Sequence, residues 1–169
     1  MKGRRVLLIN PPLLLDREFI DYPYFTGLGV VSNAAALRAR GFSVSVADAQ
    51  AQSFSGVEPT PDGRILTGCG MGALLESASG EFDAVVVAVS PYLKPQALTS
   101  FASALFSDLR ARFPSARLAA ADCYFGGMHY VEYDGARFLS EHPQVNALVK
   151  YEGETALAEL LSSPPGSGP

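Results

Sequence analysis

Residues that commonly hold metals are scarce: the 169-residue chain has two cysteines, Cys69 and Cys123, and two histidines, His129 and His142. The cysteines stand alone, without a C-x-x-C pair, which argues against a zinc site and a disulfide framework and favours a reducing cytoplasm. No apolar run approaches the ~20 residues that a membrane-spanning helix needs, so no membrane partner is expected. A G-x-x-x-x-G-K-[ST] stretch is also missing, which excludes a P-loop nucleotide site.

Charged residues are scarce as well: they make up 18% of the chain, the net charge is −4 and the pI is about 5.1. The sequence has no basic patch, so nucleic acid is not expected as a partner. Hydrophobic residues reach 48%, and we expect one globular domain over residues 1–161. Residues 162–169 are rich in Ser, Pro and Gly and are expected to form a linker or a disordered tail.

The most regular feature is the apolar segment Ala84–Val89, which is rich in β-branched valine and ends at Ser90 and Pro91. A short run that is apolar on both faces is typical of a central parallel strand covered by helices. In open α/β sheets, ligands bind beyond the carboxyl ends of the strands. We therefore expect the loop that begins at Ser90 to border a binding site.

Strand and helix patterns alternate along the rest of the chain. Strands are expected at 6–10, 42–48, 84–89, 118–121 and 145–151, and helices at 27–40, 71–79, 95–113, 136–141 and 154–161. This alternation predicts an α/β fold with a doubly wound, mostly parallel five-stranded sheet, a Rossmann-like or flavodoxin-like three-layer sandwich. The topological switch point should lie between the first and third strands.

Some local patterns predict more detail. Pro61–Gly63 is the turn signal of a small hairpin, whereas 11–26 is expected to be a long loop without regular structure. His142 precedes a proline at a helix end and should lie at the surface. In the helix expected at 27–40, an apolar face should be formed by Leu28, Val31 and Ala35, with Leu37 beside it.

A dinucleotide site is one functional interpretation. Gly27 and Gly29 supply two glycines of a G-x-G-x-x-G motif, but Ser32 replaces the third, and the motif begins far beyond the first strand. Asp48, at the end of the second strand, has the position of the acid that binds a ribose hydroxyl. A nicotinamide-dependent oxidoreductase therefore stays open as an alternative.

Three loops are expected at the carboxyl edge of the sheet, and they carry Ser90–Leu93, Gly126-Gly127 and Glu152–Glu154. Each loop alone is an ordinary connector, but together at one edge they favour a ligand site. His129 lies in the second of these loops and is a further candidate contact.

The order of these segments resembles the cobalamin-binding domain at the amino end of cobalamin-dependent radical SAM enzymes. The resemblance spans nearly the whole chain, and the order and spacing of its segments are specific. The matching segments are 5–12 (RVLLINPP), 26–29 (TGLG), 37–44 (LRARGFSV), 82–87 (FDAVVV), 126–127 (GG) and 149–155 (VKYEGET).

The resemblance implies a cobalamin whose nucleotide tail enters a groove at the strand ends. Ser90 and Leu93 match a Ser-x-Leu-type motif with one additional residue, and Gly126 and Gly127 match a glycine pair that lets the tail pass close to the backbone. The cofactor-binding residues that it implies are Asn10, Pro11, Pro12, Gly27, Leu28, Ser90, Pro91, Leu93, Gly126, Gly127, His129, Glu152 and Gly153.

Two motifs of related proteins are missing from this sequence. Related methyltransferase domains carry a cobalt-ligating histidine in D-x-H-x-x-G, but residues 11–26 contain no histidine. A C-x-x-x-C-x-x-C motif for an iron–sulfur cluster is absent too. The resemblance therefore implies cobalamin without a protein histidine ligand, a radical SAM domain or subunit as partner for methyl transfer, and no catalysis by this chain alone.

Two questions stay open at this level. The chain is interpreted as a fragment of a larger enzyme or as a standalone binding module. A second interpretation from another class is a degenerate domain of the same fold that mediates protein–protein contacts.

Overall fold

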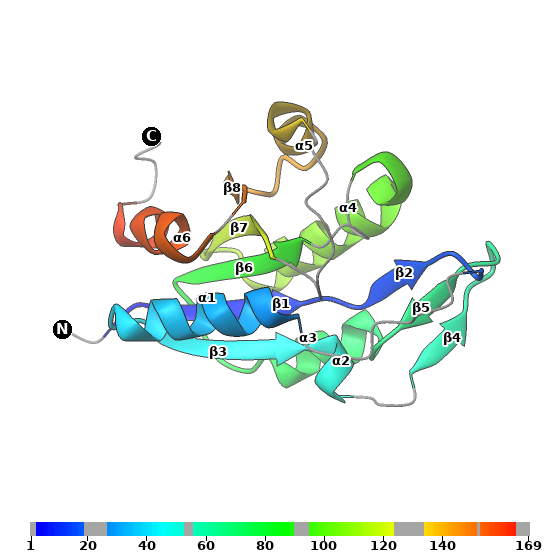
Figure 1. Ribbon diagram of the computed structural model, residues 1–169, viewed down its shortest axis with the longest axis horizontal. Helices are drawn as coiled ribbons and strands as arrows, with labels where there is room; N and C mark the ends of the chain where they lie inside the picture. Colours follow the sequence, from blue (N-terminus) through cyan, green and yellow to red (C-terminus); the bar gives the residue numbers. More distant parts are fainter. Residues whose placement is uncertain are drawn as a thin grey trace.

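The computed structural model describes residues 3–18, 27–52, 56–89, 95–123, 134–151 and 153–164, and the side chains of all of these except 95–99. Five strands form the main sheet: β1 (Arg5–Asn10), β3 (Ser43–Asp48), β6 (Ala84–Val89), β7 (Arg117–Asp122) and β8 (Ala147–Val149). They lie in the order β3-β1-β6-β7-β8, and each neighbouring pair is parallel (Figure 1). This is the predicted doubly wound α/β sheet in the flavodoxin-like order.

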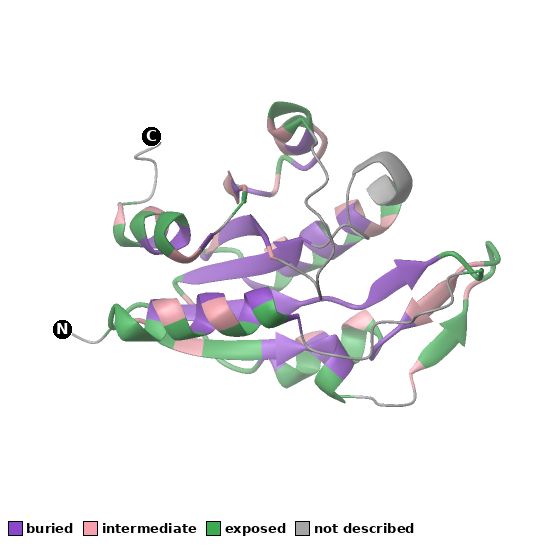
Figure 2. Ribbon diagram, viewed as in Figure 1, coloured by how far each residue is buried: buried purple, intermediate pink, exposed green. Residues whose placement is uncertain are grey.

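The strand that was predicted to be central is central. All six residues of β6 are buried, because β1 and β7 pair with its two edges and helices cover both of its faces. The period-two strand β3, predicted to be wetter, lies at an edge of the sheet and exposes Ser43, Ser45 and Val46 (Figure 2).

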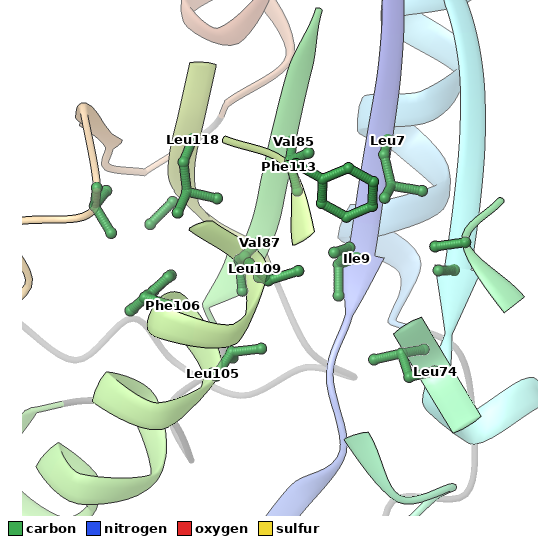
Figure 3. Close-up of a cluster of buried hydrophobic side chains, with 14 of the residues drawn as sticks. Leu7, Ile9, Leu74, Val85, Val87, Leu105, Phe106, Leu109, Phe113 and Leu118 are labelled. Carbon is green, nitrogen blue, oxygen red and sulfur yellow. The ribbon is translucent and has the colours of Figure 1, made fainter. Parts of the chain in front are cut away.

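Helices on both faces of the sheet complete three layers. α1 (Leu28–Ala39) and α6 (Gly153–Ser162) pack on the face to which Val6 and Leu8 of β1 belong. α3 (Met71–Ser77), α4 (Pro95–Arg112) and α5 (Gly135–Glu141) pack on the other face, with Leu7 and Ile9. Figure 3 shows this second core, in which side chains of α3 and α4 surround those of β1, β6 and β7. In the described part of the chain, no helix has the length and apolarity to cross a membrane.

The apolar face predicted for α1 does not pack on the sheet, although Leu37, predicted to lie beside that face, is buried. Leu28 is 72% exposed and Val31 is 51% exposed, whereas the helix buries the stripe of Val30, Ala34 and Leu37. Both stripes are apolar at helical spacing, so hydrophobic periodicity could not choose between them. The buried stripe includes small Ala34, and Gly29 is buried beside it, which lets the helix approach the sheet closely.

A second sheet was only partly predicted. β2 (Leu13–Leu15), β4 (Val57–Pro59) and β5 (Ile65–Thr67) form three antiparallel strands in the order β2-β5-β4. The hairpin between β4 and β5 is confirmed, and Gly63 takes a positive φ of 83° in its turn. The prediction of an irregular 11–26 is wrong for β2, whose partner strand lies far downstream. Figure 1 shows this sheet beyond the carboxyl ends of β1 and β3, where the short helix α2 (Ala49–Gln52) also lies.

His142 is buried rather than at the surface, which corrects another expectation. Its ring lies 4.7 Å from the ring centroid of Phe138 and 5.1 Å from that of Phe106, and it is 0% exposed. α5 packs on α4 at this point, so the residue that ends α5 is enclosed between the two helices. A proline after a histidine indicates a helix end but not whether that end is solvated.

Candidate functional site

The candidate site lies at the carboxyl edge of the main sheet. β1 and β6 are neighbours there, and the chain leaves β1 toward β3 and β6 toward β7, so the switch point falls between them, as predicted. Seven of the residues implied by the resemblance lie outside the described residues: Ser90, Pro91, Leu93, Gly126, Gly127, His129 and Glu152. In the sequence, Ser90 comes directly after Val89, which is the last residue of β6.

Asn10 ends β1 and connects the ends of two strands. Its Nδ2 donates a 2.9 Å hydrogen bond to Oδ1 of Asp48, and the backbone N–H of Gln50 donates to the same oxygen at 2.8 Å. The Gln50 side chain in turn donates to the carbonyl of Thr67 in β5. Asn10, Asp48 and Gln50 are all buried, so this network holds the main and second sheets together.

The next two predicted residues, Pro11 and Pro12, are also buried. They redirect the chain from β1 into β2, because proline cannot continue a parallel ladder as a donor. Asn10, Pro11 and Pro12 are therefore brought together at the strand end. In the described structure, these three residues hold the carboxyl end of β1 against β3 and direct the chain into β2.

Gly153 was also predicted to contact a cofactor, and the structure supplies an internal reason for this glycine. A Cβ at this position would lie 3.1 Å from Oδ1 of Asn33 in α1 and 3.6 Å from Cγ1 of Val149. Asn33 is itself 2% exposed, and its Nδ2 donates to the carbonyl of Gly29 at 2.8 Å. Gly153 therefore permits the close approach of α6 to α1.

The Asn33 side chain borders a small cavity beneath this edge. The cavity has a volume of about 10 Å³, close to the space of a single water molecule, and Cys123, Val30 and Leu157 help to line it. Oδ1 of Asn33 has no hydrogen-bond partner among the described residues. Its Nδ2 also lies 3.8 Å from Sγ of Cys123.

Two residues at the ends of β7 and β8 were not singled out by the sequence. Asp122 is 7% exposed, and one of its carboxylate oxygens accepts a 3.4 Å hydrogen bond from the backbone N–H of Tyr151. Tyr151 has a φ of 65°, which is uncommon for a residue other than glycine and marks a strained backbone beside the site. The signal that could have found Asp122 is its place directly after a predicted strand.

Cys123 follows Asp122 and is held as a neutral thiol. Burial raises the pKa of Cys123 to about 12, and the carboxylates of Asp122 and Glu154 act in the same direction. Glu154 accepts a 2.6 Å hydrogen bond from the hydroxyl of Ser32, which joins α6 to α1. Because the thiolate is the reactive form of cysteine, Cys123 is not an activated nucleophile.

The described edge combines a buried polar frame with exposed apolar side chains. Gly27 caps the start of α1, and Leu28 follows it at 72% exposure. Tyr151 lies two residues beyond the end of β8 and is 54% exposed. Among the described residues, no three His, Cys, Asp or Glu side chains come together as a metal site. The buried hydrogen bonds of Asn10 and Asp48 hold this edge in place, and Leu28 and Tyr151 present apolar surface to solvent beside it.

Comparisons with known proteins complete this description. No protein-family model matches the chain, and no curated protein sequence matches it. Among solved structures, the chain is similar to a candidate transcriptional regulator protein from Vibrio parahaemolyticus, with 13% sequence identity and a TM-score of 0.44 over 98% of this chain and 94% of that chain. The fold assignment rests on the strand order of the structure itself.

Proposed function

We propose that the chain is a cobalamin-binding module that serves a radical SAM domain or subunit. The observation that carries the proposal is the strand order, because it aligns the starts of the three candidate loops at one edge. In the sequence, residues 90–93 come after β6, residues 126–127 come after β7, and residues 152–154 come after β8. A ligand at the switch point between β1 and β6 would contact these loops.

The exposed side chains at this edge support a ligand with a large apolar surface. In the described part of the chain, Leu28 and Tyr151 are two of five large hydrophobic side chains that stay exposed, and both belong to the carboxyl edge. A planar corrin ring would cover such side chains, and covering them is favourable because it removes apolar area from water. The described residues at the edge fit the cofactor in this respect.

The chain's own residues would hold and shield the cofactor. Asn10 and Asp48 keep the ends of β1 and β3 in register. Gly126 and Gly127 would leave room for the nucleotide tail. When bound, cobalamin would supply the methyl-carrying cobalt, while the protein would contribute orientation and exclusion of water.

A protein-interaction domain is the second candidate, favoured by a different observation. Two exposed valines lie on neighbouring elements: Val31 of α1 is 51% exposed, and Val46 of the edge strand β3, which α1 contacts, is 40% exposed. By contrast, the nicotinamide alternative gains no support. Asp48 already accepts two hydrogen bonds within the protein. In the chain, β2 comes between β1 and the Gly27–Gly29 segment, whereas a dinucleotide motif has its glycines directly after the first strand.

Retention of cobalamin tests the proposal directly. Purified protein is incubated with hydroxocobalamin, passed through gel filtration and examined by visible absorption, with NADH as the parallel probe. We expect the corrin absorption to elute with the protein and NADH not to. Retention of NADH without corrin would reverse the ranking of the two ligands.

Two glycine-to-valine variants, one in the proposed groove and one outside it, test where the cofactor binds. Gly127→Val should weaken cobalamin affinity by at least tenfold, about 1.4 kcal/mol, because a side chain would fill space that the tail needs. Gly72→Val is the matched control, since a Cβ at Gly72 in α3 meets no atom within 4 Å. If a folded Gly127→Val variant binds cobalamin like the parent protein, the assigned tail groove is wrong.

A further inference from the structure

A groove of about 720 Å³ lies at the amino edge of the main sheet, opposite the candidate cofactor site. Its walls come from the starts of β1, β6 and β7 and from the carboxyl ends of α4 and α6. Its volume is in the range of ligand sites, but eight of its 17 lining residues are exposed and only five are buried. It is therefore an open groove rather than an enclosed pocket.

Two of the four arginines in the groove have a structural role. A guanidinium N–H of Arg4 donates to the carbonyl of Leu161 and, at 3.1 Å, to that of Ser163. Arg117 donates to the carbonyl of Leu160 at 2.6 Å. The carbonyls of Leu160 and Leu161 belong to the last turn of α6 and that of Ser163 follows it, so Arg4 and Arg117 cap this end of the helix and complement its dipole.

The other two arginines are arranged differently. Cζ of Arg5 lies 5.5 Å from the ring centroid of Phe82, and Cζ of Arg112 lies 5.1 Å from that of Phe113. The two rings contact each other edge to face, with centroids 5.8 Å apart. A guanidinium over a ring is fixed in direction while its N–H groups stay available in the plane for a carboxylate. Among the described residues, neither guanidinium forms an ion pair.

The groove is locally positive in an acidic chain. Its lining has four arginines against the two carboxylates of Glu81 and Asp83, a balance of +2, whereas the whole chain carries −4. An oxygen of the Asp83 carboxylate accepts a 2.7 Å hydrogen bond from the backbone N–H of Arg5, so this carboxylate already has a partner within the protein. The charge complement of this surface is a ligand with several carboxylates.

We propose that this groove binds an extended acidic segment of a partner protein, with carboxylates paired to Arg5 and Arg112. The open shape favours a polypeptide over an enclosed small molecule, and the Phe82–Phe113 pair offers an apolar surface between the charges. This inference is independent of cobalamin binding, because the two sites lie at opposite edges of the sheet.

Fluorescence anisotropy with a labelled peptide of alternating glutamate and glycine tests the inference. The parent protein should bind this peptide at a salt concentration of about 50 mM and more weakly at about 300 mM, because the contacts are ionic. The double variant Arg5→Gln/Arg112→Gln should bind at least about tenfold more weakly. A peptide with glutamine in place of glutamate should not bind.

The control removes the same charge elsewhere. Arg64→Gln/Arg137→Gln changes two arginines that do not line the groove and should leave peptide binding unchanged. Failure of the parent to bind the peptide, or equal weakening by the control, would overturn the inference. Competition by citrate or inorganic phosphate at the same total charge would overturn the polypeptide occupant in favour of a small anion.

If the glutamine double variant does not fold, Arg5→Lys/Arg112→Lys replaces it. That variant keeps the charge but loses the planar fork, and unchanged binding by it would contradict the proposed pairing.

Discussion

The contact between Gly153 and Asn33 predicts a specific loss of stability. In Gly153→Ala, the new Cβ would lie 3.1 Å from Oδ1 of Asn33, closer than an ordinary van der Waals contact. Asn33 cannot retreat easily, since it is 2% exposed and its Nδ2 is bonded to the carbonyl of Gly29. Crowding of this kind costs about 1–3 kcal/mol, and the better helix propensity of alanine offsets at most about 0.5–1 kcal/mol.

Gly135 provides a matched control, because it is also the first residue of a helix. A Cβ at Gly135 would meet Cδ2 of Leu148 at 3.3 Å and Cδ of Lys150 at 3.5 Å, which are ends of flexible side chains. Gly135→Ala should therefore be neutral or slightly stabilising. The propensity gain is common to both variants, so their difference in unfolding free energy, about 1–3 kcal/mol, measures the crowding itself.

Urea unfolding followed by circular dichroism measures both variants, with equal m-values as the sign that only stability has changed. In an Asn33→Ala background, the penalty of Gly153→Ala should shrink, because the crowded oxygen is gone. Equal stability of Gly153→Ala and Gly135→Ala would refute the assigned contact. A penalty that persists without the Asn33 side chain would assign it to another neighbour.

Two further predictions concern titrating groups. Burial raises the pKa of Cys123 to about 12, so little thiolate is present at pH 8. In a Cys69→Ser variant, iodoacetamide should therefore modify Cys123 roughly a thousandfold more slowly than it modifies a free cysteine. Rapid modification would contradict the raised pKa. Burial lowers the pKa of His142, so the unfolded chain, with an ordinary value of 6.5, binds this proton more readily than the folded chain. Stability should therefore be retained above pH 6.5 and fall as the pH drops below it, and urea midpoints of His142→Phe should show a smaller fall; an identical pH profile would contradict this linkage.

Much of the fold was predictable because it depends on local patterns. The valine run of β6 is typical of a strand that is buried on both faces of a parallel sheet, and the alternation of β3 indicates an edge strand. The turn at Gly63 needs a positive φ, which glycine adopts at little cost. From these signals the strand order followed, and with it the edge at which the candidate loops begin.

Only the tertiary structure decided which of several possible contacts each residue makes. α1 carries two apolar stripes, and the fit of Ala34 and Leu37 against the sheet left Leu28 exposed at the candidate site. β2 pairs with β5, and His142 is enclosed by α4 and α5, through partners that are remote in sequence. Periodicity reports how apolar a face is, but close packing in three dimensions selects the face, the partner and the buried polar groups.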